Sequence, residues 1–157
     1  NKGGGVLVVL DNRTTAMTGH QPHPGTGITA KGEPTAEIKI EDVVRAMGVK
    51  DVAIVDSYDL KAVETALRHA LEFDGPSVVI CRRACALLKG LPNLGKAVIN
   101  QEKCTQCHAC LRTGCPALVS HPDGSVTIDP NACNGCFVCG QVCAFGAIEK
   151  AGGGERG

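Results

Sequence analysis

Eight cysteines in the last third of the chain form two runs of similar spacing, and they are the residues best suited to carry chemistry. Each run has three thiols at steps of three residues and a fourth thiol a few residues later. The runs are Cys104, Cys107, Cys110 and Cys115, then Cys133, Cys136, Cys139 and Cys143. A short loop with this spacing can wrap around one corner of an iron–sulfur cube and bind it through the three thiols. The sequence therefore predicts two [4Fe–4S] clusters and electron transfer.

The two runs superpose at an offset of 29 residues, and Ile99 and Ile128 keep the same offset ahead of them. This pattern indicates an internal duplication. In two-cluster ferredoxins the fourth cysteine of each run binds the cluster of the other run. We therefore predict one cluster on Cys104, Cys107, Cys110 and Cys143, and the other on Cys133, Cys136, Cys139 and Cys115.

Two other uses of cysteine fit the spacing less well. Structural zinc sites take two separated Cys-x-x-Cys pairs, not three equally spaced thiols. A disulfide framework suits secreted proteins, but no secretory signal precedes these runs. The four residues between Cys110 and Cys115, and Ala144 after Cys143, are interpreted as loop adjustments. Cys81 and Cys85 lie outside both runs and are predicted to be buried structural thiols.

The composition limits the possible partners. Lys and Arg number 16, as do Asp and Glu, so the formal net charge is zero and no nucleic-acid or anionic-membrane partner is expected. The apolar run Val6–Leu10 is far shorter than the roughly 20 residues that span a bilayer, so we predict no membrane segment. Cluster thiolates are damaged by oxidation, which favours the cytoplasm of an anaerobe.

Before the cysteines, short apolar runs alternate with helical periodicity. Three β-branched runs are predicted to be buried parallel strands, namely 6–10, 52–55 and 78–81. Helices are predicted over Ile40–Met47 and from Leu60 to Leu71, the second capped by Asp59. The order indicates an α/β unit with a parallel sheet, in which ligands bind at the carboxyl ends of the strands. Arg82 and Arg83 are predicted to be a solvated pair at a strand end.

The polar stretch Asp11–Gly27 follows the first strand at its carboxyl end. Its backbone amides, hydroxyls and Asp-Asn pair suit a diphosphate bridged to Mg²⁺. An alternative from the residues alone is a loop that only turns the chain and caps a helix. The sequence assigns no role to His20, His23 or His108.

The run Leu10–Gly25 resembles the thiamine-diphosphate loop of the indolepyruvate:ferredoxin oxidoreductase α subunits, in the family of 2-oxoacid:ferredoxin oxidoreductases. The resemblance continues through 54–56, 73–77 and 81–83 and into the cysteine runs. It implies that the Asn12 side chain and the Thr14 carbonyl bind Mg²⁺, and that Thr18 and Gly19 lie against thiamine diphosphate. No Gly-Asp element precedes Leu10, so the chain is expected to be a C-terminal fragment, with no assignable catalytic acid or base.

The resemblance also implies an activity, which is oxidative decarboxylation of aryl pyruvates to acyl-CoA and CO₂. The electrons would pass through the clusters to ferredoxin, and a second (β) subunit and coenzyme A would be partners. We expect the C-terminal part of a thiamine-diphosphate domain over 1–97, a small α+β two-cluster ferredoxin domain over 98–150 and a flexible tail over 151–157. The alternatives are an electron carrier on a non-catalytic α/β scaffold, and a related enzyme with another 2-oxoacid substrate.

Overall fold

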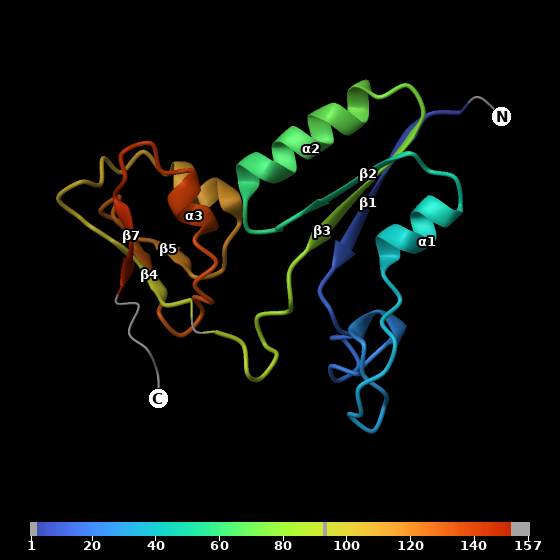
Figure 1. Ribbon diagram of the computed structural model, residues 1–157. Coiled ribbons are helices and arrows are strands. Elements are labelled where there is room, and N and C mark those ends of the chain that lie inside the picture. The colour runs from blue at the N-terminus through green and yellow to red at the C-terminus, as the bar shows by residue number, and fades with distance from the viewer. Residues whose placement is uncertain (1–2, 93, 152–157) are drawn as a thin grey trace. The chain divides into compact units, whose positions relative to one another are not determined.

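The computed structural model describes residues 3–92 and 94–151, and the chain divides into two compact units, Asn1–Lys89 and Gly90–Gly157 (Figure 1). The expected boundary after residue 97 would cut through the strand β4 (Lys96–Ile99). Because β4 pairs with the last strand of the chain, it belongs to the second unit, which starts earlier than expected. Within the described ranges, no helix is long and apolar enough to cross a membrane.

The first unit is built on a three-stranded parallel sheet with the order β1-β3-β2. Its elements are β1 (Gly5–Asp11), α1 (Ile40–Ala46), β2 (Asp51–Val55), α2 (Leu60–Glu72) and β3 (Pro76–Arg82). The expected alternation of strands and helices is thus confirmed. Because the register pairs Asp11 with Arg82, β1 and β3 end together at the carboxyl edge of the sheet.

Helix α2 covers one face of this sheet (Figure 1). It starts where predicted, because the Asp59 side chain accepts a hydrogen bond from Ala62 N at 2.9 Å and satisfies a free amide of the first turn. Ala70 of the helix packs with Val79 and Cys81 of β3 in a buried cluster. The helix therefore buries the central strand most completely.

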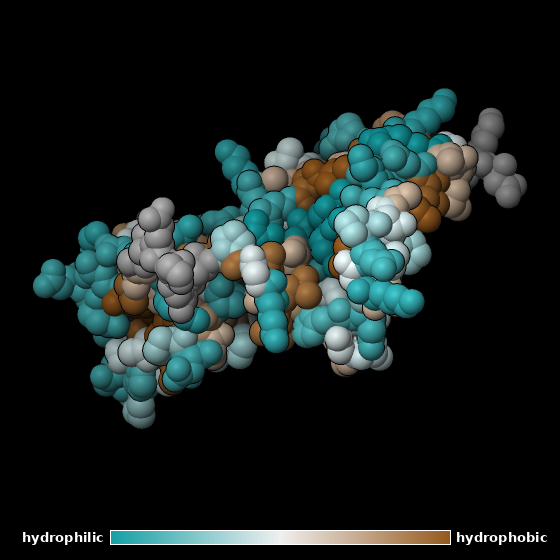
Figure 2. All heavy atoms as spheres, turned by 60° about the horizontal axis from the view of Figure 1, so that its bottom comes forward, coloured by the Kyte–Doolittle hydropathy of each residue, from teal (hydrophilic) through white to brown (hydrophobic). Residues whose placement is uncertain are grey.

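The expected burial of all three strands is only partly right. The central strand β3 contains the fully buried Val79 and Ile80, each 0% exposed. The edge strand β1 instead leaves Leu7 57% and Leu10 80% exposed, because strands and helices of the described chain cover it on one side only. Large hydrophobic side chains consequently reach the surface among hydrophilic ones (Figure 2).

The long polar stretch between β1 and α1 is organised by local contacts. Thr15 and Gln21 form an antiparallel bridge, and a short 3-10 helix, η1 (Pro24–Thr26), follows. Arg13 reaches across the stretch to Glu37, with Nη2 and Oε1 2.8 Å apart. These contacts hold the segment between β1 and α1 in a defined loop conformation.

The second unit is a small α+β arrangement of two antiparallel strand pairs, β4 with β7 and β5 with β6. Its further elements are η2 (Ala109–Thr113), β5 (Leu118–Ser120), β6 (Val126–Ile128), α3 (Val138–Gln141) and β7 (Ile148–Ala151). Ala151 thus belongs to β7 and not to the expected tail, whose residues 152–157 lie outside the described residues.

The buried core of the second unit is thin. Its buried hydrophobic side chains are mostly small: Ala97, Ala117, Val126, Cys139, Ala147 and Ile148. Four cysteines of the two runs pack in or against the main cluster: Cys110, Cys133, Cys139 and Cys143. Thiols therefore take the place that large aliphatic side chains hold in the first unit.

Candidate functional site

The two cysteine loops repeat the same backbone conformation. Gln106 and Gly135, which are 29 residues apart, both have positive φ angles, of 53° and 76°. His108 and Phe137, at the same offset, have φ angles of 58° and 59°. Left-handed residues between right-handed ones turn successive backbone amides toward a common centre, a geometry found at anion and iron–sulfur sites. The duplication seen in the sequence is therefore also a duplication of local structure.

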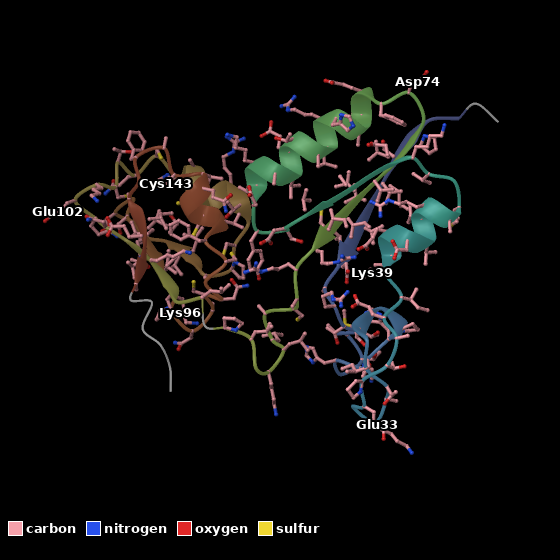
Figure 3. The ribbon with its side chains drawn as sticks, viewed as in Figure 1. Glu33, Lys39, Asp74, Lys96, Glu102 and Cys143 are labelled. Atoms are coloured by element: carbon pink, nitrogen blue, oxygen red, sulfur yellow. The ribbon has the colours of Figure 1, made fainter. Side chains whose placement is uncertain are left out.

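Two hollows in this unit are lined by the eight thiols. One is lined by Cys104, Cys107, Cys110 and Cys143, together with apolar side chains such as Ile99 and Phe145. The other is lined by Cys115, Cys133, Cys136 and Cys139, together with Leu118 and Ile128. Each hollow therefore takes three thiols from one run and the fourth from the other, and sulfur atoms gather around α3 near Cys143 (Figure 3).

The thiols influence one another's ionisation within these groups. Burial, together with the nearby Cys136, Cys115 and Cys133, raises the pKa of Cys139 to about 11. Burial likewise raises the pKa of Cys110. Bound iron would instead lower the pKa of these thiols, since iron binds thiolates and compensates their charge.

Backbone amides also point at the sulfur atoms. Burial tends to raise the pKa of Cys143, but amide hydrogen bonds from residues 145–148 outweigh it and lower the pKa, with Ala147 N 3.3 Å from Sγ. In the other hollow, Ala97 N lies 3.5 Å from Cys133 Sγ, and Lys96 Nζ donates to Cys133 O. The two amide donors to sulfur, Ala147 N and Ala97 N, would stabilise thiolates and tune the potential of a bound cluster.

The histidines of this unit make contacts away from sulfur. His108 Nε2 lies 2.9 Å from Gly124 O, and His121 Nε2 lies 2.8 Å from Thr127 Oγ1. All ten cysteines of the chain are free thiols. In residues 3–92 and 94–151, no three His, Cys, Asp or Glu side chains converge closely enough to hold a single metal ion.

The carboxyl edge of the first unit's sheet contains a tight turn built around Asn12. Asn12 Oδ1 accepts a hydrogen bond from Thr14 N at 3.1 Å, and Asp11 Oδ1 accepts one from Arg13 N at 3.0 Å. Arg13 between them has a φ of 60°. Asn12 is exposed whereas Thr14 is 7% exposed. An amide oxygen has two lone pairs, so Asn12 Oδ1 can accept from Thr14 N and still face a cation.

Thr18 and Gly19 lie elsewhere in the same loop, at the tip of the small hairpin closed by Thr15 and Gln21. Thr18 Oγ1 and Gln21 Oε1 are 2.5 Å apart, and the Gln21 amide donates to Thr18 O. The structure therefore brings Asn12 and Thr14 into one turn, while Thr18 and Gly19 occupy an exposed neighbouring segment.

A buried charge network behind the turn was not expected. Arg82 donates from Nε to Asp11 Oδ2 at 2.7 Å and from Nη2 to Glu41 Oε2 at 2.6 Å. Arg82 lowers the pKa of Glu41 to about 2. Burial would raise the pKa of Asp11, but hydrogen bonds from Arg82 and from Arg13 N outweigh it and lower the pKa. The expectation of a solvated Arg82 is therefore wrong.

Arg83 is also held, with Nη1 2.7 Å from Asp56 Oδ2 and the guanidinium 4.6 Å from the centre of the Tyr58 ring. Of the two other cysteines, Cys81 is buried as predicted. Cys85 is only partly buried, with Sγ 3.8 Å from His20 Nε2. His23 Nδ1 accepts from Gly25 N at 3.1 Å and caps η1.

Comparison with known proteins identifies close relatives. The chain is 47% identical to the indolepyruvate oxidoreductase subunit IorA of Pyrococcus horikoshii over 163 residues, covering 99% of the chain and 25% of the relative. It is 45% identical to IorA of Methanothermobacter thermautotrophicus over 155 residues, covering 98% of the chain and 25% of the relative. These similarities confirm the resemblance to this group. The chain spans about a quarter of the length of these curated relatives.

A shorter segment is similar to formate hydrogenlyase subunit 2 of Escherichia coli K12. The two sequences are 31% identical over 84 residues, which cover 46% of the chain and 41% of that subunit. No solved structure matches the chain. Residues 1–81 match the family described as "Thiamine pyrophosphate enzyme, C-terminal TPP binding domain". That match covers more than half of the chain and includes the Asn12 turn, so the chain belongs to the thiamine pyrophosphate enzyme family.

Proposed function

We propose that this chain supplies part of a thiamine diphosphate and Mg²⁺ site and two [4Fe–4S] clusters to a 2-oxoacid:ferredoxin oxidoreductase that acts on aryl pyruvates such as indolepyruvate. The main support is the lining of the two hollows, each with four thiols. The names of the relatives, which are indolepyruvate oxidoreductase subunits, support the substrate class and a partner subunit. Ferredoxin and coenzyme A as partners, and a cytoplasmic location, belong to the same proposal.

The thiols fit the clusters in number and position. Cys104, Cys107, Cys110 and Cys143 would hold one cluster, and Cys133, Cys136, Cys139 and Cys115 the other. The amides aimed at Cys143 and Cys133 would stabilise the charge on the bound thiolates. A pair of four-iron clusters accepts electrons one at a time at low potential, which suits a strongly reducing decarboxylation.

The Asn12 turn fits the edge of a cation site. Asn12 Oδ1 and the Thr14 carbonyl are hard oxygen ligands of the type that Mg²⁺ prefers. Asp11 is not a candidate ligand, because its buried carboxylate is occupied by Arg82 and by Arg13 N. Thiamine diphosphate, when bound, supplies the carbanion chemistry of decarboxylation, while the protein supplies binding and orientation.

Two double variants test the cluster assignment. Cys104→Ser with Cys143→Ser removes ligands from one proposed cluster only, so about four irons per chain should remain. Cys104→Ser with Cys115→Ser removes one ligand from each cluster and should damage both. Iron analysis and electron paramagnetic resonance distinguish the two results. Ligation within each run would give the reverse pattern and refute the crossed assignment.

A single variant tests the thiamine half. In the complete oxidoreductase with its partner subunit, Asn12→Ala should abolish cofactor-dependent reduction of ferredoxin and leave about eight irons on the chain. If the variant still decarboxylates aryl pyruvates at the parent rate, the loop is not the cofactor site. The electron-carrier alternative would then be favoured. A separate assay of the parent enzyme with a panel of 2-oxoacids distinguishes aryl pyruvates from other substrates.

A further inference from the structure

One guanidinium joins three elements at the carboxyl edge of the first unit's sheet. Arg82 ends β3, Asp11 ends β1, and Glu41 lies in the first turn of α1. Arg82 binds Asp11 through Nε at 2.7 Å and Glu41 through Nη1 and Nη2 at 3.1 and 2.6 Å. Both carboxylates are buried, with Asp11 6% and Glu41 7% exposed. The Nε, Nη1 and Nη2 atoms of the Arg82 guanidinium therefore all donate to the two carboxylates, which fixes the orientation of the guanidinium.

This network lies directly behind the Asn12 turn. Asp11 uses its second oxygen, Oδ1, to accept from Arg13 N at 3.0 Å. Arg13 is held at a φ of 60°, a conformation that a residue with a side chain rarely adopts without support. The unusual backbone at Arg13 is what lets Thr14 N turn back to Asn12 Oδ1. The position of the Asn12 oxygen therefore depends on Asp11.

Backbone contacts fix the same turn from the β3 side. Arg83 N donates to Asp11 O at 3.0 Å, and Cys85 N donates to Asn12 O at 2.9 Å. The main chain of Asn12 is thus anchored independently of Arg82. What Arg82 adds is the orientation of the Asp11 carboxylate and, through it, of Arg13 and the amide side chain of Asn12.

We propose that Arg82 is a positioning residue for the Mg²⁺ and diphosphate site. It holds Asp11 so that the turn presents Asn12 Oδ1 and the Thr14 carbonyl, and it keeps the Asp11 carboxylate from turning toward the cation in place of Asn12. This inference rests on the proposed thiamine function. It goes beyond it by assigning a role to a residue that contacts neither metal nor cofactor.

The test uses the complete oxidoreductase with its partner subunit. The measured quantity is the Mg²⁺ concentration that gives half-maximal binding of thiamine diphosphate in equilibrium dialysis. Arg82→Lys keeps the charge but loses the fork, so this concentration should rise by about 10–100-fold, the usual cost of losing a residue that orients a metal ligand. Saturating Mg²⁺ should restore cofactor binding and kcat, because the ligands themselves remain.

The matched control is Arg83→Lys, whose side chain binds Asp56 and not Asp11. It should change the Mg²⁺ midpoint by less than about 2-fold, since its backbone amide still anchors Asp11. If Arg82→Lys lowers the melting temperature but leaves the Mg²⁺ midpoint at the parent value, Arg82 serves the fold alone and the proposal is overturned.

A second variant covers the case in which Arg82→Lys does not fold. Asp11→Asn keeps an acceptor oxygen for Arg13 N but places an amide N–H donor opposite the Arg82 Nε–H, so the bond to Arg82 is lost, and the variant should also raise the Mg²⁺ midpoint by about 10-fold. An unchanged midpoint in this variant would equally overturn the proposal. Failure of the thiamine function itself would appear differently, because the parent enzyme would then bind no thiamine diphosphate at any Mg²⁺ concentration.

Discussion

The two units of the chain organise their candidate sites in different ways. In the first unit, the Asn12 turn lies at the edge of a sheet whose central strand is buried from Ser77 to Cys81, and a buried ion network fixes the turn before any ligand binds. In the second unit, the thiols themselves form much of the packed cluster around Ala97 and Ile148. The first site is supported by the protein itself, whereas the second site, under the proposed function, would be completed by its clusters.

This difference follows from the side chains available to each unit. A parallel sheet covered by a helix buries long aliphatic side chains. This burial offsets the conformational entropy that the chain loses on folding, so no bound metal is needed. Strands of three or four residues and small buried side chains cannot do so in a unit as small as Gly90–Gly157, a size at which metals commonly supply the missing stability. Ligand removal should therefore affect the two units unequally.

The largest expected effect is unfolding of the second unit when iron is removed. Chelation under reducing conditions should expose the amides of β4 and β7 to hydrogen exchange, because cluster binding contributes their folding free energy. The amides of β3 should remain protected in the same sample. Hydrogen exchange followed by mass spectrometry measures both, and a second unit that stays protected without iron would contradict the comparison.

The next largest effect concerns the core of the first unit. Ile80→Ala removes a fully buried side chain from the central strand and should lower the free energy of unfolding by about 2–5 kcal/mol. The iron content should stay at that of the parent. Ile54→Ala, at a side chain 44% exposed on β2, is the matched control and should cost less than half as much. Urea unfolding monitored on the β3 amides gives these values.

Most of the first unit could be predicted from the sequence because its elements have strong periodicity. The predicted strand 78–81 lies within β3, and the cap at Asp59 is present. The exposure of β1 could not be predicted, since a continuous apolar run looks the same in an edge strand and in a central one. The Asp11–Arg82 pair was missed, although opposite charges at the ends of two neighbouring parallel strands were a usable signal.

The second unit shows a different limit. Its cysteine spacing predicted the duplication, which the matching φ angles of His108 and Phe137 now show in the backbone. Its strands were not predicted, because segments of three or four residues are too short for periodicity to appear. Contacts such as that of Lys96 Nζ with Cys133 O depend on the tertiary arrangement and leave no local pattern.

A smaller effect should appear on acidification of the first unit. Arg82 lowers the pKa of Glu41 from 4.5 to about 2, so the ion pair contributes its full stability above pH 4.5 and loses it as the pH falls toward 2. The loss should be no more than about 3 kcal/mol. Glu41→Gln should flatten this pH dependence, whereas Glu64→Gln, in the exposed pair with Arg68, should not. The loss of stability can be measured by hydrogen exchange of the β3 amides at a series of pH values.

The smallest effect tests whether the duplicated loops of the second unit are equivalent. Gly135 and Gln106 occupy matching positions with positive φ angles, but a Cβ on Gly135 would collide with the backbone carbonyl of Gly95. Gly135→Ala should therefore destabilise the loaded second unit by about 1–3 kcal/mol, from strain at positive φ together with overpacking.

Gln106 already carries a side chain at a φ of 53°, so Gln106→Ala should change the stability by less than about 0.5 kcal/mol. Thermal unfolding of the iron-loaded protein, with iron counted before and after, compares the two variants. Equal losses would mean that the two loops have the same surroundings. A loss confined to Gly135→Ala is the expected result, because only this variant adds a Cβ at a positive φ and brings it against the carbonyl of Gly95.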